Sequence, residues 1–178
     1  MYEEGEANAI GTEYVRADLM QAEQAGQTRT LMLQYLDARV AFYRADYGPH
    51  LAVANDRTDH LQRQLWSTVT PMAAAAPTPV AALVVSGMND VLNAQGYTQS
   101  AWWNRVPNSA WALLIVIACF ANLLVGYDAK RTGGYLLLVL PMLAAISFFL
   151  IADLDSPRGG MIRVTPRNLL SLSETLHR

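Results

Sequence analysis

The chain of 178 residues has one cysteine, a net charge near zero and no cluster of basic residues. Cys119 cannot form a disulfide within the chain, and no Cys/His spacing of a metal site is present. The net charge of −2 gives no basic footprint for nucleic acid. Because no stretch alternates apolar and polar residues over the length of a strand, we do not expect a β-sheet.

Motifs of enzymes are missing as well. The sequence has no phosphate-binding loop, no Ser-His-Asp spacing and no His-Glu-x-x-His. The three histidines, His50, His60 and His177, are scattered. Asp56 lies one helical turn before His60, and such a pair more often sits on a surface than in a ligand set. We therefore expect neither an enzyme nor a cofactor.

Two charge-free apolar runs, Ala110–Tyr127 and Tyr135–Ala152, lie near the end of the chain. Eighteen residues form a helix about 27 Å long, and the hydrocarbon core of a bilayer is about 30 Å thick. The connector Asp128–Gly134 is so short that the helices must run antiparallel. Buried helices of a soluble core are the alternative, but such helices normally carry a polar stripe. The runs predict a transmembrane hairpin and a multi-pass protein of the cell membrane.

The start of the chain, MYEEGEANAI, has neither the basic region nor the apolar core of a signal peptide. We expect insertion to depend on the hairpin or on sequence outside this chain. Aromatic residues flank the predicted spans: Trp102, Trp103 and Trp111 before the first, and Tyr127 and Tyr135 around the connector. Such rings settle at the headgroup level, so we interpret them as interfacial rather than as core aromatics.

Arginine and lysine near the runs set the expected orientation. The positive-inside rule compares the Lys and Arg residues of the connector with those before the first span and after the second. It places the first hundred residues and the tail together in the cytoplasm. The residues compared are Lys130 and Arg131 in the connector, Arg105 before the first span, and Arg158, Arg163 and Arg167 in the tail.

The first hundred residues are predicted to form helices. The segments Glu3–Leu19 and Ala22–Ala45 are rich in helix-forming residues, and Gly48-Pro49 marks a break. After the break, a seam of apolar and threonine residues repeats at alternating steps of three and four, which is typical of a helix that packs on another helix. We interpret it as a contact within one bundle. The seam residues are Leu51, Ala54, Thr58, Leu61, Leu65, Thr68 and Met72.

Two further helices complete the predicted fold. One begins near Pro79, where proline suits a first turn, and runs towards Arg105. The other, Pro166–Leu176, places three leucines on one face. We expect this face to dock on the bundle, and lying on the membrane is the alternative. The expected architecture is an all-α membrane protein. It has a helical cytoplasmic domain (1–105), a hairpin (106–152, with spans at about 110–127 and 135–152) and a cytoplasmic tail (153–178).

Four stretches together carry a family resemblance: EEGEANAIGTEYVRADL at the start, LMLQYLDARVAFYRA at 31–45, NRVP at 104–107 and FLIADLDSPRGGMIRV after the second run. They resemble the bestrophin-like membrane proteins of bacteria, a family whose domain has no established function. The residues that mark the resemblance are Glu6, Asn8, Gly11, Arg105, Pro107, Asp153, Asp155, Pro157 and Arg163.

The resemblance implies an anion-channel or transport-related subunit that acts as a homo-oligomer in the bilayer, with an anion as its ligand. The alternative is a non-conducting membrane scaffold whose helical domain binds a partner. Members of the family usually carry another apolar hairpin before the Glu-Ala-Asn stretch, and true bestrophins have their pore helix in the N-terminal part. The resemblance therefore implies that this chain lacks an N-terminal hairpin and does not conduct alone.

Asp153 and Asp155 are the only candidate metal ligands. An EF-hand loop needs oxygen ligands at its first, third and fifth positions and glycine at the sixth. Asp153 and Asp155 fit the first two, but Pro157 and Arg158 occupy the others. We therefore expect no metal site, and a polar turn paired with Arg158 or Arg163 instead.

Asn122 is a polar residue in the middle of the first run. Amides within a membrane usually bond to a neighbouring helix, and lining a pore is the alternative. Pro141 should kink the second span. Glu6 and Asn8 are expected either to contact another helix or to lie on a solvated face.

Overall fold

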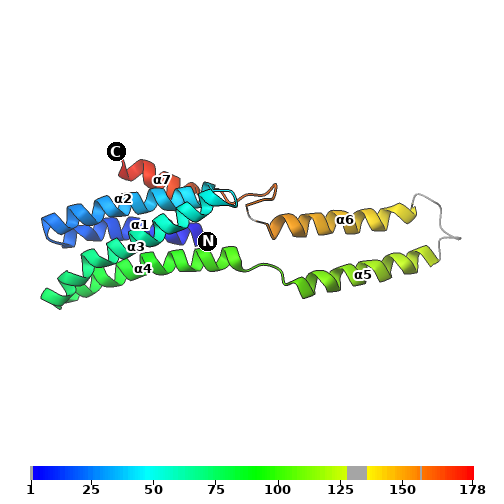
Figure 1. The fold of residues 1–178 in the computed structure, drawn as a ribbon, viewed down its shortest axis with the longest axis horizontal. Helices are drawn as coiled ribbons and strands as arrows, with labels where there is room; N and C mark the ends of the chain where they lie inside the picture. Colours follow the sequence, from blue (N-terminus) through cyan, green and yellow to red (C-terminus); the bar gives the residue numbers. More distant parts are fainter. Residues whose placement is uncertain (1, 128–135, 157) are drawn as a thin grey trace. The chain divides into compact units, whose positions relative to one another are not determined.

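The computed structural model describes residues 2–127, 136–156 and 158–178, and every regular element in these ranges is a helix. The all-α prediction is confirmed. The chain divides into two compact units, which we call the bundle unit (Met1–Trp103 with Val164–Arg178) and the hairpin unit (Asn104–Arg163). The helices are α1 (Tyr2–Arg16), the 3-10 turn η1 (Ala17–Leu19), α2 (Ala22–Arg44), α3 (Pro49–Ala75), α4 (Pro79–Trp103), α5 (Asn108–Tyr127), α6 (Leu136–Leu154) and α7 (Arg167–Leu176) (Figure 1).

Proline and glycine set the helix boundaries of the bundle unit as predicted. Gly48 precedes α3 with a φ of 119°, a backbone conformation that L side chains rarely adopt, and Pro49 occupies the first turn. Pro79 opens α4, and the Thr78 hydroxyl accepts the N–H of Ala81 at 3.1 Å. Both helices therefore begin where proline has the required φ and where the missing N–H removes no bond.

The predicted seam of α3 is confirmed as a contact within one bundle. Ala54, Leu61 and Leu65 are buried, and α3 packs against α2 and α4. Thr68 is also buried, and it accepts a hydrogen bond from Thr28 of α2 at 3.1 Å. Threonine is tolerated in this seam because the hydroxyl has hydrogen-bond partners.

Helix α7 docks on the bundle, as predicted for the tail. It packs against α1 and α2, and Leu169 is fully buried. The Glu3 carboxylate accepts the backbone N–H of Leu169 at 2.9 Å and an amide N–H of Asn168 at 2.6 Å. Gly11 lies against Leu172, since a Cβ on Gly11 would stand 3.2 Å from Cδ1 of that leucine. The leucine face of α7 is thus used within the bundle unit.

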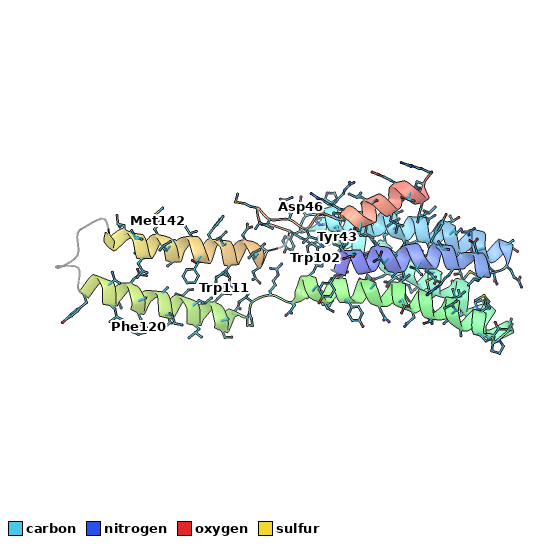
Figure 2. The ribbon with its side chains drawn as sticks, turned by 180° about the vertical axis from the view of Figure 1, so that it is seen from behind. Tyr43, Asp46, Trp102, Trp111, Phe120 and Met142 are labelled. Atoms are coloured by element: carbon cyan, nitrogen blue, oxygen red, sulfur yellow. The ribbon has the colours of Figure 1, made fainter. Side chains whose placement is uncertain are left out.

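Trp102 corrects the expectation of an aromatic belt. It lies in α4 and packs edge-on against Phe42 and Tyr43 of α2, with ring centroids 5.6 Å and 5.8 Å away (Figure 2). Trp102 is therefore partly buried against the bundle core, because its position in α4 turns the ring towards α2. Trp103, the next residue, is exposed.

The hairpin unit consists of α5 and α6, which pack side by side (Figure 1). All 20 residues of α5 are described and none is buried. Figure 2 shows Phe120 of α5 and Met142 of α6 on opposite outer sides of the hairpin, and both side chains are exposed. In the hairpin, Trp111 lies 6.4 Å from the ring of Phe148. The connector with Lys130 and Arg131, and Tyr135 after it, lies outside the described residues.

One segment of the described chain is long and apolar enough to cross a membrane. It lies within Pro79–Tyr127, has a mean hydropathy of 2.2 in its best window, and none of that window is buried. A second apolar helix, Leu138–Leu154, is shorter as far as it is described. The apolar character of both predicted spans is thus accompanied by exposure, which a soluble core helix does not have.

Candidate functional site

A buried polar cluster joins α1, α2 and α4 around the carboxylate of Glu6. Arg39 Nε of α2 donates to Glu6 Oε1, and Arg39 Nη2 lies 3.4 Å from Oε2. The hydroxyls of Tyr43 and Thr98 donate to Oε2 at 3.2 Å and 3.0 Å. The side chains of Glu6 and Arg39 are both 0% exposed, so this ion pair is fully removed from solvent.

Aromatic rings surround the pair, and the two phenols among them stay neutral. Arg39 lies with its guanidinium carbon 4.3 Å from the centroid of the Phe42 ring, a cation–π geometry. Burial raises the pKa of Tyr35 and Tyr43 far above the usual value, and the negative charge of Glu6 adds to both rises. Both phenols therefore keep their protons at any physiological pH, and Tyr43 remains a donor to Glu6.

From the sequence we expected Glu6 at a helix contact or on a solvated face, and its partners Arg39, Tyr43 and Thr98 were not predicted. Tyr35, Arg39 and Tyr43 follow one another at steps of four, so they share one face of α2. That face is otherwise apolar, and Leu36 and Phe42, three residues before and after Arg39, are buried. An arginine on an apolar helix face was the available signal, because a buried arginine requires a carboxylate partner.

Glu13 is a second buried carboxylate of α1, seven residues after Glu6. It is 1% exposed, and its two oxygens have no hydrogen-bond partner within the ranges that the structure describes. The nearest cation, Arg16 Nη1, lies 3.6 Å from Oε2. Gly87 of α4 faces this carboxylate, since a Cβ on Gly87 would collide with Glu13 Oε2 and with Arg16 Nη1.

This environment makes Glu13 titratable near neutral pH. Burial raises the pKa of Glu13 from 4.5 to about 7, the positive charge of Arg16 lowers it, and the negative charge of Asp90 on α4 raises it further. A carboxylate removed from water without donors is more stable when protonated. Glu13 can therefore hold or release a proton in the pH range of a cell.

Asn122 lies in an open groove of about 900 Å³ between α5 and α6. Its Nδ2 donates to the carbonyl of Ala118 in the same helix at 2.7 Å, and its buried Oδ1 has no partner among the described residues. The expected bond to a neighbouring helix is therefore not the one observed. The groove is lined mainly by small and apolar residues, among them Cys119, Gly126, Pro141, Ala144 and Phe148.

Asp153 and Asp155 bind backbone N–H groups. Asp153 is buried and accepts the N–H of Met161 at 2.5 Å and that of Ile162 at 3.0 Å, one on each oxygen. Asp155 accepts the N–H of Val106 at 2.7 Å. Across the described ranges, no group of three or more His, Cys, Asp or Glu side chains could hold a metal ion. The two carboxylates organise the chain around the end of α6.

The other signature residues differ in exposure and surroundings. Asn8 is exposed on α1, and Arg105 and Arg163 are exposed in the hairpin unit. The carbonyl of Pro107 accepts two N–H groups from the first turn of α5, so it caps the start of that helix. Pro157 lies outside the described residues. The signature thus does not converge on one site; Glu6, Pro107, Asp153 and Asp155 each fix a different junction between segments.

The profile of the Bestrophin-like domain matches residues 4–169, which takes in both units from α1 to the start of α7. No curated protein and no solved structure matches the chain.

Proposed function

The chain belongs to the bestrophin-like family, and from this premise we propose that it is an integral membrane protein. In this proposal the α5–α6 hairpin crosses the bilayer, and the protein acts as an anion-channel or transport-related subunit of a homo-oligomer. The observation that carries the proposal is the 20-residue helix α5, which buries none of its residues. A contiguous apolar surface of this size is unusual on a soluble monomer and marks an interaction with lipid or with other chains.

The dimensions and bonding of the hairpin support a membrane location. At 1.5 Å per residue, α5 is about 30 Å long, equal to the hydrocarbon thickness of a typical bilayer. Within a helix every backbone group bonds inside the segment, as lipid requires. Leu123 and Leu124 in α5, and Leu138 and Met142 in α6, are among the large apolar side chains left exposed.

Membrane extraction tests this proposal. The chain should stay in the pellet after carbonate and high-salt washes, which remove peripheral proteins. Leu123→Arg places a charge in α5 and should weaken retention, because an arginine costs up to about 2.5–3.5 kcal/mol within a span, the upper figure applying at its centre. Val53→Arg, at an equally exposed position of α3, is the matched control and should have no effect. Recovery of the parent chain in the supernatant would refute the membrane proposal.

We further propose that both chain ends are cytoplasmic, from the arginines that flank the hairpin. In a Cys119→Ala background, a cysteine replacing Thr132 of the connector should react with an impermeant thiol reagent on intact cells. Labelling only after permeabilisation would invert the topology.

The second candidate function is the non-conducting scaffold, and the polar groups of the hairpin favour it. Asn122 Nδ2 and the Ser147 hydroxyl both donate to carbonyls of their own helices. An ion path needs rings of carbonyl or charged groups, or a wide pore with an apolar gate. We expect that the 178-residue chain in liposomes passes no chloride above background. Chloride flux from this chain that is lost on Asn122→Leu would contradict the scaffold and support conduction.

A further inference from the structure

We propose that the loop after α6 is a membrane-surface anchor, in which Met161 and Ile162 insert among the lipid headgroups. The proposal deepens the membrane function above and rests on it. Met161 is 83% exposed and Ile162 is 57% exposed, although they are adjacent apolar residues. Both belong to the hairpin unit.

The loop is held in place by the end of α6. The Asp153 carboxylate accepts the N–H of Met161 on one oxygen and the N–H of Ile162 on the other, at 2.5 Å and 3.0 Å. Gly160 makes this approach possible, because a Cβ there would collide with the carboxylate and the carbonyl oxygen of Asp153. The two apolar side chains are therefore exposed on a backbone that is hydrogen-bonded to the helix end, and not on an unattached segment.

The same end of the hairpin contains the start of α5. The Asp155 carboxylate accepts the N–H of Val106, just before α5, at 2.7 Å. If the helices cross the hydrocarbon core, this end lies at the headgroup level, because α5 is about as long as that core is thick. Leu154, the last residue of α6, is also exposed. The apolar surface of the span thus reaches the residues that carry the loop.

The composition of the loop fits a lipid surface. The apolar pair is followed by the basic residue Arg163, which is exposed. Apolar residues beside basic ones bind at the boundary of headgroups and acyl chains, and anionic lipids strengthen this binding. The occupant that the loop fits is therefore the headgroup region of the leaflet in which α6 ends.

A fluorescent probe on the loop tests the anchor. The full chain carrying Cys119→Ala and Met161→Cys is labelled with an environment-sensitive dye and placed in phosphatidylcholine vesicles, with or without phosphatidylglycerol. We expect blue-shifted emission, quenching by lipids with a nitroxide near the headgroup, and a larger shift with the anionic lipid. The same label on Val53→Cys, in the exposed face of α3, should report water.

Two variants separate the anchor from its alternatives. Asp153→Ala should move the loop probe towards water, whereas Asp155→Ala, which leaves both loop bonds in place, should not. Water-like emission from the parent loop in a chain that resists carbonate would overturn the anchor and leave the membrane function standing. Extraction of the chain by carbonate would overturn the membrane function itself. A blue shift that depends on protein density and is not quenched by nitroxide lipids would assign the loop to a second copy and overturn the lipid assignment.

Discussion

Replacing Glu13 by Gln should remove a large pH dependence from the stability of the bundle unit. Glu13 is buried against Gly87 without a hydrogen-bond partner in the described chain, and its pKa is raised from 4.5 to about 7. The charged groups that face it are Arg16 on its own helix and Asp90 on α4. Glutamine has nearly the same shape but no charge at any pH, so it isolates the effect of ionisation.

The sign and size of this pH dependence follow from the raised pKa of Glu13. Between pH 4.5 and 7 the unfolded chain has lost the proton of Glu13 while the folded chain keeps it, so the free energy of unfolding falls as the pH rises. The contribution is fully present below pH 4.5 and is lost above about pH 7. A shift of roughly 2.5 units corresponds to about 3 kcal/mol. Relative to the parent, Glu13→Gln should therefore gain about 3 kcal/mol on going from pH 4.5 to pH 8.

Urea unfolding of the full chain in nanodiscs measures this difference. The fluorescence of Trp102 reports the bundle, because this ring packs on Phe42 and Tyr43, and the other tryptophans are replaced by phenylalanine. Glu4→Gln, at an exposed position of the same helix, is the matched control and should follow the parent. If the parent and Glu13→Gln lose stability in parallel as the pH rises, the burial argument for Glu13 is wrong.

Three further predictions, which use five substitutions, test the packing of the bundle unit by the same unfolding assay. Gly87→Ala should lower the free energy of unfolding by about 1–3 kcal/mol, because the added Cβ meets the buried carboxylate of Glu13. Gly96→Ala, where nothing lies within 4 Å of the added Cβ, should raise it by up to about 1 kcal/mol. Equal effects of the two variants would contradict the close approach of α4 to Glu13 at Gly87. Arg39→Met should cost about 3–5 kcal/mol by leaving Glu6 buried and unpaired, and adding Glu6→Met should restore much of it. Glu3→Ala should cost about 0.5–2 kcal/mol and speed amide exchange in α7, whose start it caps; unchanged exchange would refute that cap.

The helices could be predicted because their signals are local. Gly48-Pro49 and Pro79 mark boundaries through backbone restrictions that act within one or two residues. The seam of α3 could be identified as well, because a helix that packs on others repeats its buried positions every three or four residues. The leucine face of α7 predicted docking for the same reason.

The contacts between helices could not be predicted because they join distant residues. Arg39 and Thr98 both donate to Glu6, and they lie 33 and 92 residues away from it along the sequence. The burial of Glu13 depends on the close approach of α4 at Gly87, which no pattern within α1 indicates. Trp102 looked interfacial because it stands near an apolar run, whereas its position depends on how α4 meets α2.

The two buried carboxylates of α1 divide its contact with α4 into a strong and a weak part. Glu6 has a guanidinium and two hydroxyl donors, including Thr98 of α4, and these donors compensate its charge. Glu13, two turns away, meets α4 at Gly87 with no donor in the described chain. An apolar residue at this position would avoid the cost of burying a charge. The contact between α1 and α4 is therefore weaker whenever Glu13 is ionised. As the pH rises through 7, opening of α1 from α4 should therefore begin at Gly87 while the Glu6–Arg39 end stays closed.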